Sequence, residues 1–144
     1  MNRVIDRTIP AGPLGMLQRG EGPRASGVAP LAARDPARAR RRRIRCAACG
    51  HEITTADTRV SVDGAHVHTR TNPDGQTFTF GCFAAAPGCV AAGAPSLQAT
   101  WFPGHFWWIE LCGGCRAHVG WQFFADGGGD FHGLVLDRVC EVEV

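Results

Sequence analysis

The sequence predicts an all-β domain that is fixed by a structural metal site. Short segments rich in valine, threonine and phenylalanine recur between turn residues, and no stretch sustains the period of a long helix. Two Cys-x-x-Cys pairs stand far apart in the chain, and each has a spacing typical of metal ligands. With 144 residues, of which 44% are hydrophobic, the chain is long enough to fill one core.

The candidate strands follow one another along the chain and are separated by turn signals. The earlier strands are divided by Asp63-Gly64 and by the Asn-Pro-Asp-Gly stretch at 72–75, and the later ones by Pro103-Gly104 and residues 126–129. We expect strands at residues 59–62, 65–70, 76–80, 100–102, 106–111, 118–124 and 131–136. Residues 81–96 are rich in small residues and predict a loop or a short helical turn.

The charge is divided unevenly between the two ends of the chain. Residues 1–43 carry ten arginines against three acids, a net +7, whereas residues 44–144 carry five arginines against ten acids, a net −5. We expect residues 1–43 to be a disordered tail rich in arginine, alanine and proline, and residues 44–144 to be the folded domain. Because every basic residue is arginine, the composition is biased, and a solvated tail is favoured over an arm that binds nucleic acid.

Targeting and membrane signals are missing from the sequence pattern. No apolar stretch approaches the ~20 residues of a spanning helix, and the first thirty residues contain no apolar core of a signal peptide. We therefore expect a cytoplasmic protein without a membrane partner.

Seven cysteines, an odd number, argue against a complete disulfide framework. Cys46 and Cys49 form one Cys-x-x-Cys turn and Cys112 and Cys115 form another, and two such turns supply the four thiolates of a closed, structural Zn²⁺ site. An entire sheet must lie between the two turns. Unrelated thiol turns or redox pairs are the alternative, although the βαβ context of a redox pair is missing. The remaining thiols at 82 and 89 are expected to be buried apolar groups.

All four tryptophans lie between residues 101 and 121. Because residues two apart on a strand share a face, Trp107 lies on one face of its strand and Trp121 and Phe123 share one face of the next. Trp101 precedes a turn and can close a third side, so the four rings predict an aromatic cage. The alternative is that these rings are simply core. Trp108, with Glu110, faces the other way.

Motifs spread over about residues 44–138 resemble the thalidomide-binding CULT domain of the cereblon type, in its bacterial single-domain form. They are C-x-x-C-G at 46–50, N-P-x-G at 72–75, P-S-x-x-x-[ST]-W-F-x-G-x-x-W at 95–107, C-x-x-C-x-x-H-x-G-W-x-[FY] at 112–123 and F-x-G-L at 131–134. The resemblance implies a β-tent fold, in which two antiparallel sheets meet near a four-cysteine zinc site.

The resemblance also implies a function, because the pocket of that family holds the glutarimide ring of thalidomide and cyclic imides formed at protein C-termini. Carried over by position, Trp101, Trp107 and Trp121 are the walls of the cage and Phe123 is its floor. Asn72 leans over the pocket, and the backbone of Ala99 and Trp101 hydrogen-bonds the imide. Such a domain is a non-catalytic binder with no catalytic residues.

Two departures from the family pattern and two other classes of protein bear on this interpretation. Ala99 replaces a larger side chain and opens one wall, and Trp108 replaces a small polar residue.

The Cys-Gly-Gly-Cys stretch is also similar to methionine sulfoxide reductases of the B type, but those enzymes need a His where this chain has Trp121 and a nucleophilic Cys upstream of Cys140. An interaction module that reads methylated ammonium groups or modified protein ends is the third class, and a reader of ammonium groups usually adds an acidic counter-charge.

Overall fold

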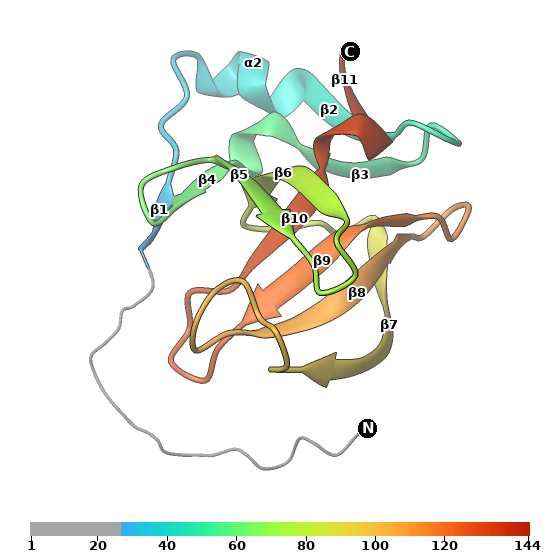
Figure 1. Cartoon of the computed structure of the whole chain (residues 1–144). Coiled ribbons are helices and arrows are strands. Elements are labelled where there is room, and N and C mark those ends of the chain that lie inside the picture. The colour runs from blue at the N-terminus through green and yellow to red at the C-terminus, as the bar shows by residue number, and fades with distance from the viewer. Residues whose placement is uncertain (1–26) are drawn as a thin grey trace.

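The structure is a computed structural model that describes residues 27–144. It confirms the all-β class: three antiparallel sheets make up the domain (Figure 1). Within the described range, helical structure is confined to α2 (Pro36–Arg41) and to two 3-10 turns, η2 (Ala56–Thr58) and η3 (Leu136–Arg138). No helix in this part of the chain has the length and hydrophobicity needed to cross a membrane.

The largest sheet has six strands in the order β5-β6-β10-β9-β8-β7. Their bounds are β5 (Val67–Thr71), β6 (Thr77–Phe83), β7 (Cys89–Ser96), β8 (Phe106–Cys112), β9 (His118–Phe124) and β10 (Phe131–Val135). All neighbouring pairs in it are antiparallel. The strands expected at 106–111, 118–124 and 131–136 are confirmed, because their Phe, Trp and Val residues alternate between a core face and an outer face.

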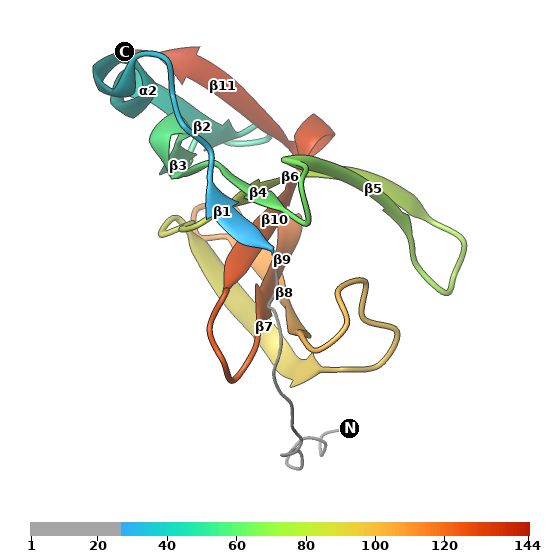
Figure 2. The same cartoon turned by 90° about the vertical axis from the view of Figure 1, so that its left-hand side faces the viewer.

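The second sheet joins the two ends of the described chain. It has the order β11-β2-β3, with β2 (Arg42–Cys46), β3 (Glu52–Thr55) and β11 (Val139–Glu143). A two-stranded ribbon pairs β1 (Val28–Pro30) with β4 (Val60–Val62). Figure 2 shows the three-stranded sheet at one end of the molecule, above the six-stranded sheet. Two antiparallel sheets therefore meet as expected, and the two-stranded ribbon of β1 and β4 is a further sheet that the sequence did not predict.

The expected boundary at residue 44 is wrong, because residues 28–43 form β1, α2 and the start of β2. Asp35 caps α2 by accepting a hydrogen bond from the Arg38 backbone N–H at 3.1 Å, and Pro36 supplies the first turn. Composition suggested a solvated tail, but the acids that hold this segment lie about a hundred positions later in the sequence. The part of the expected tail at 1–26 lies outside the described residues.

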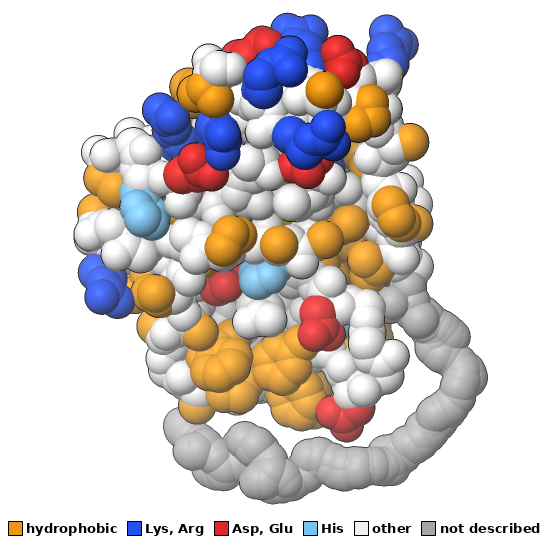
Figure 3. Space-filling view, turned by 180° about the vertical axis from the view of Figure 1, so that it is seen from behind, with side chains coloured by type: hydrophobic (Ala, Val, Ile, Leu, Met, Phe, Trp, Pro, Cys, Tyr) orange, Lys and Arg blue, Asp and Glu red, His pale blue; other side chains and the backbone are white. Residues whose placement is uncertain are grey.

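Ion pairs hold this segment against the end of the chain. The guanidinium of Arg38 lies 3.1 Å from the carboxylate of Glu143, and Arg42 contacts both Glu141 and Glu143. Arg59 also reaches Glu141, at 2.7 Å. Basic and acidic side chains accordingly stand side by side at the end of the molecule where α2 and β11 lie (Figure 3). These arginines are paired within the domain.

Two further sequence expectations are corrected in the segment before β8. Residues 100–102 form a bend between two turns, and residues 81–96 contain the end of β6 and all of β7. The small residues of β7 give no strand pattern in the sequence. As an edge strand, β7 is held mainly by its backbone pairing with β8 rather than by large apolar side chains. Its pairing is irregular between Ala92 and Ser96, and it tolerates Pro95 as edge strands do.

The core consists of two clusters. Rings from the six-stranded sheet fill the first, where Phe80, Phe123 and Phe131 are almost fully buried. Gly133 makes room for this stack, since a Cβ there would lie 2.7 Å from the Phe80 ring. The second cluster joins the two large sheets and consists of Ile44, Cys46, Ile53, Phe83, Ala86, Cys112, Val119 and Leu134.

Candidate functional site

Four cysteines meet where the two large sheets approach each other. Cys46 ends β2 and Cys112 ends β8, while Cys49 and Cys115 stand in the turns that follow. Their four sulfur atoms lie within 4.8 Å of one another, with 3.7 Å between Cys46 and Cys115 and 3.6 Å between Cys49 and Cys112. The expected grouping of two distant turns, with a sheet between them, is confirmed.

The two turns have the same backbone geometry. The carbonyl of each first cysteine accepts a hydrogen bond from the N–H four residues later, at Gly50 and Arg116 (2.8 Å each). Both of those residues have a positive φ, 81° and 67°. Gly114 lets the turns approach closely, since a Cβ there would lie 2.9 Å from the Cβ of His51. Two matched turns therefore present their thiols to one point.

This arrangement fits a four-coordinate metal ion. Tetrahedral Zn–S bonds of about 2.3 Å require sulfurs about 3.8 Å apart, which is close to the observed spacing. Backbone N–H groups point at two of the sulfurs, from His51 to Cys49 at 3.4 Å and from Gly114 to Cys112 at 3.3 Å. Burial opposes ionisation of Cys112, but hydrogen bonds from the backbone N–H groups of Cys115 and Gly114 and from the thiols of Cys49 and Cys46 outweigh it and lower its pKa to about 7. The spacing of the four sulfurs is thus suited to holding one metal ion.

The tryptophans gather on one face of the six-stranded sheet. Trp107 pairs with Phe123 across β8 and β9, and Trp121 pairs with Ile109, so Trp107 and Trp121 are diagonal neighbours on the same face. Trp101 comes from the loop between β7 and β8 and lies 5.0 Å from Trp121, with the two rings nearly perpendicular. All three indoles belong to or pack against the same buried cluster. We call them the tryptophan cluster.

Hydrogen bonds to the backbone fix two of these indoles. Trp101 Nε1 donates to the carbonyl of Thr71 at 3.1 Å, and Trp107 Nε1 donates to that of Gln98 at 2.8 Å. Among residues 27–144, the structure gives the indole N–H of Trp121 no acceptor, although this ring is only 7% exposed. Two of the three indoles are therefore oriented by the protein itself, and the N–H of the third has no partner in the described part of the chain.

The other candidate ligand-binding residues lie around this cluster in different ways. Ala99 is exposed in the loop before Trp101 and has a φ of 56°, which is unusual for a residue other than glycine. The Asn72 side chain caps its own turn, since its Oδ1 accepts from the backbone N–H of Asp74 and Gln76. Phe123 is 1% exposed and stacks on Phe131, so it lies beneath the cluster within the core.

Trp108 and Glu110 lie on the opposite face, as alternation predicts. Trp108 Nε1 donates to the carbonyl of Gly93 at 2.8 Å, which ties the irregular edge strand β7 to β8. Glu110 is 4% exposed and pairs with His132 Nδ1 at 2.8 Å. The structure thereby gives Trp108 a role at the edge of the sheet.

Sequence reasoning missed two side chains that pack against Trp121. The Phe78 ring lies 5.1 Å from Trp121 and 6.3 Å from Trp101, and the His118 ring lies 5.0 Å from Trp121 on another side. The signal for Phe78 was present, because Phe78 and Phe80 alternate with threonines on one face of β6. His118 lies in the motif at 112–123, in which the sequence predicted roles only for the cysteines, Trp121 and Phe123.

Comparison with known proteins places a short part of this chain beside cereblon. The segment is 53% identical over 34 residues to the protein cereblon of Drosophila melanogaster, and 50% identical over 34 residues to that of Drosophila virilis. These matches cover 24% of this chain and 6% or 5% of the fly proteins. No family model matches the sequence. A cereblon-like relationship is therefore supported for this segment, and the chain spans a small fraction of its curated relatives.

Proposed function

We propose that this domain is a non-catalytic binding module for a small cyclic imide, with glutarimide as the simplest ligand. The observation that carries the proposal is the tryptophan cluster, in which Trp101, Trp107 and Trp121 share one face and two of them are oriented by backbone hydrogen bonds. Walls that are oriented before a ligand arrives lower the entropic cost of binding a flat ring. The cereblon-like segment and the motifs described above support the same class of ligand.

Backbone groups supply the polar contacts in this proposal. The carbonyl of Ala99 accepts the imide N–H, and the backbone N–H of Trp101 donates to an imide carbonyl. Two features of the loop support this: Ala99 is exposed and its left-handed φ turns its peptide groups away from regular structure. The Asn72 turn forms the rim, and Phe123 supports the cluster from the core. An imide at a protein C-terminus is the corresponding macromolecular ligand.

A neutral ring fits the cluster better than a cation. Readers of ammonium groups usually place a carboxylate beside the aromatic walls. Glu110, the acid of β8, lies on the other face and is paired with His132. The reductase alternative finds little support, because Cys140 lies on β11 in the three-stranded sheet, whereas the cluster belongs to the six-stranded sheet.

The metal in this proposal is a structural Zn²⁺ held by Cys46, Cys49, Cys112 and Cys115. Four thiolate ligands at a closed site favour zinc, and such a site supplies folding energy rather than chemistry. Because these ligands must stay reduced, we also propose a cytoplasmic location.

A titration with glutarimide tests the function. The wild type should bind with a dissociation constant on the order of micromolar, because a ring of few heavy atoms buries little surface. Trp101→Ala, Trp107→Ala and Trp121→Phe should each weaken binding at least about tenfold through loss of a wall. N-methylglutarimide should not bind, because it lacks the donor that the Ala99 carbonyl accepts.

Trp108→Ala is the matched control, since it removes an indole from the opposite face of the same strand. It should reduce thermal stability and leave the dissociation constant unchanged. If the wild type shows no saturable binding at millimolar glutarimide, or if Trp108→Ala weakens binding as much as Trp121→Phe, the proposal is wrong.

A further inference from the structure

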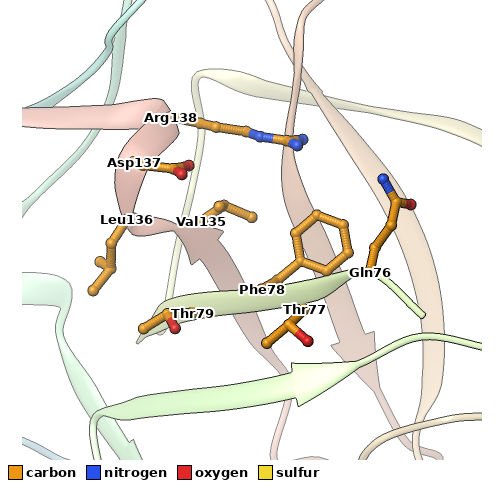
Figure 4. Close-up of a pocket in the computed structure, with 8 residues that line it drawn as sticks. All are labelled: Gln76, Thr77, Phe78, Thr79, Val135, Leu136, Asp137 and Arg138. Carbon is orange, nitrogen blue, oxygen red and sulfur yellow. The ribbon is translucent and has the colours of Figure 1, made fainter.

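A polar pocket of about 480 Å³ lies between β6 and η3 (Figure 4). Its lining comes from Gln76 and the start of β6, and from the end of β10 and the 3-10 turn that follows it. The residues are Gln76, Thr77, Phe78, Thr79, Val135, Leu136, Asp137 and Arg138.

Two groups with N–H donors converge at one end of the pocket. The guanidinium of Arg138 extends over the Phe78 ring, with its central carbon 5.4 Å from the ring centroid. Asn72 Nδ2 donates to Gln76 Oε1 at 3.2 Å, which leaves the amide nitrogen of Gln76 for the pocket. Figure 4 shows that nitrogen on the side of the amide that faces Arg138. Groups of this kind bind a carboxylate or another oxygen acceptor.

The Arg138 end of the pocket is positively charged. Within residues 27–144 no ion pair joins Arg138 to an acidic side chain, whereas Arg38, Arg42 and Arg59 are all paired. Arg138 Nη1 donates to the carbonyl and to Nδ1 of His118, at 3.1 and 3.3 Å, and this holds the guanidinium in place. Asp137 also lines the pocket, but Figure 4 shows its carboxylate near the base of Arg138, away from Gln76.

This end of the pocket adjoins the tryptophan cluster. Both side chains that contact the guanidinium, Phe78 and His118, also pack against Trp121, at 5.1 and 5.0 Å between ring centroids. Phe78 therefore packs against the cluster and also contacts Arg138 of the pocket. A substituent on a ring held by the cluster would need only to pass Phe78 to reach Arg138.

We propose that Arg138 and Gln76 form an anion subsite for the ligand of the tryptophan cluster, so that the preferred ligand is a cyclic imide that carries a carboxylate. The inference rests on the proposed function, because it assigns the second part of the same ligand. Phe78 separates the two subsites and contacts the linker between ring and acid. The acid enters from the Gln76 side, where Asp137 does not oppose it.

The experiment compares matched ligands that differ in one charge. The probes are glutarimide, 3-aminoglutarimide acylated with succinic or glutaric acid, and the corresponding terminal carboxamides. The wild type should bind the better acid about tenfold more tightly than its amide, which is typical of a charge-assisted contact. This preference should shrink as salt is raised from about 0.05 to about 0.5 M.

Arg138→Gln should bring the acid-to-amide ratio of affinities close to one and leave the affinity for plain glutarimide unchanged. Arg138→Lys should keep part of the preference, because it keeps the charge. Arg43→Gln is the control of equal charge change, since Arg43 pairs with Glu52 outside the pocket. Melting curves of each variant establish that it is folded.

The outcomes separate the two proposals. If the wild type binds plain glutarimide but treats acid and amide alike, or if Arg138→Gln keeps the preference, the subsite is wrong and the ring-binding site stands. If no glutarimide compound binds, both proposals fall. If Arg43→Gln removes the preference for acid over amide as completely as Arg138→Gln does, the preference comes from the net charge of the protein, and the subsite is also wrong.

Discussion

Burial gives the cysteines outside the metal centre different reactivities. Cys82 is fully buried in the first core cluster, and burial raises the pKa of its thiol to about 12. Burial likewise raises the pKa of Cys89 to about 12. Cys140 is exposed on β11. Because the thiolate is the reactive form, burial protects Cys82 and Cys89 in the native state.

Iodoacetamide at about pH 8 should therefore alkylate Cys140 in the native protein while Cys82 and Cys89 remain unmodified. Unfolding in denaturant should make all three react at similar rates. Peptide mapping by mass spectrometry measures each site separately. Modification of Cys82 in the native protein as fast as Cys140 would contradict its placement in the core.

Single residues differ in how far the sequence could predict their place. The grouping of Cys46, Cys49, Cys112 and Cys115 followed from spacing, because two Cys-x-x-Cys turns together supply the four ligands of one tetrahedral metal site. The place of Trp108 did not follow, because its acceptor is the carbonyl of Gly93 in a strand that composition hid. The Arg138 contact with His118 was equally invisible, since it joins two elements 20 residues apart.

At the scale of elements, an ion-pair network attaches the first part of the domain to the last. Burial alone would raise the pKa of Glu141, but hydrogen bonds from Arg42 and Arg59 outweigh it and hold the pKa below its usual value of 4.5. Glu141 thus joins β2 and the residue before β4 to β11. A carboxylate with a lowered pKa stabilises the folded state at neutral pH.

Glu141→Gln should lower the free energy of unfolding at pH 7 by about 1 kcal/mol, since its carboxylate is partly buried and pairs with two arginines. The unfolded state takes up the proton first as pH falls, so the contribution of Glu141 is full above about pH 4.5 and disappears as pH drops through the lower, folded pKa. Urea unfolding of both proteins between about pH 7 and pH 3 measures the difference.

Glu52→Gln is the control. Glu52 makes a single ion pair, with Arg43, and this pair is more exposed than those of Glu141, so the substitution should lower the free energy of unfolding by less. A difference between wild type and Glu141→Gln that stays constant down to pH 3 would show that the charge of Glu141 is not what stabilises the fold.

Elements with strong alternation were predicted, and those held by other means were not. β9 matches its expected range, because Val119, Trp121 and Phe123 face the core in turn. β2 and β11 were not predicted, because their arginines and glutamates are typical of solvated segments. Only the pairing of the two strands brings these charges together. α2 was not predicted for the same reason, although Asp35 and Pro36 are local signals of a helix start.

At the scale of the whole molecule, the four-cysteine cluster connects the two large sheets. Cys46 and Cys112 both belong to the second core cluster, so metal ligands and apolar contacts hold the same junction. Residues 50–111 separate the two cysteine turns, and a metal bound to both closes a long loop. Metal binding is therefore expected to be coupled to folding.

Elemental analysis should find one zinc ion per chain, and removal with a chelator should unfold the domain or lower its melting temperature by more than about 10 °C. Cys112→Ser should have the same effect. Cys140→Ser, which removes an exposed thiol outside the cluster, is the control and should melt like the wild type. A metal-free preparation with unchanged melting would refute the structural role of the site.

The central claim is that a flat ring binds at three of the four tryptophans. The four indole N–H groups give four signals in a ¹H–¹⁵N correlation spectrum, and Trp→Phe substitutions assign them. Saturation with glutarimide should shift the signals of Trp101, Trp107 and Trp121 and leave that of Trp108 in place, while N-methylglutarimide should shift none. No shifts at millimolar glutarimide, or a shift of Trp108 as large as that of Trp121, would contradict the account.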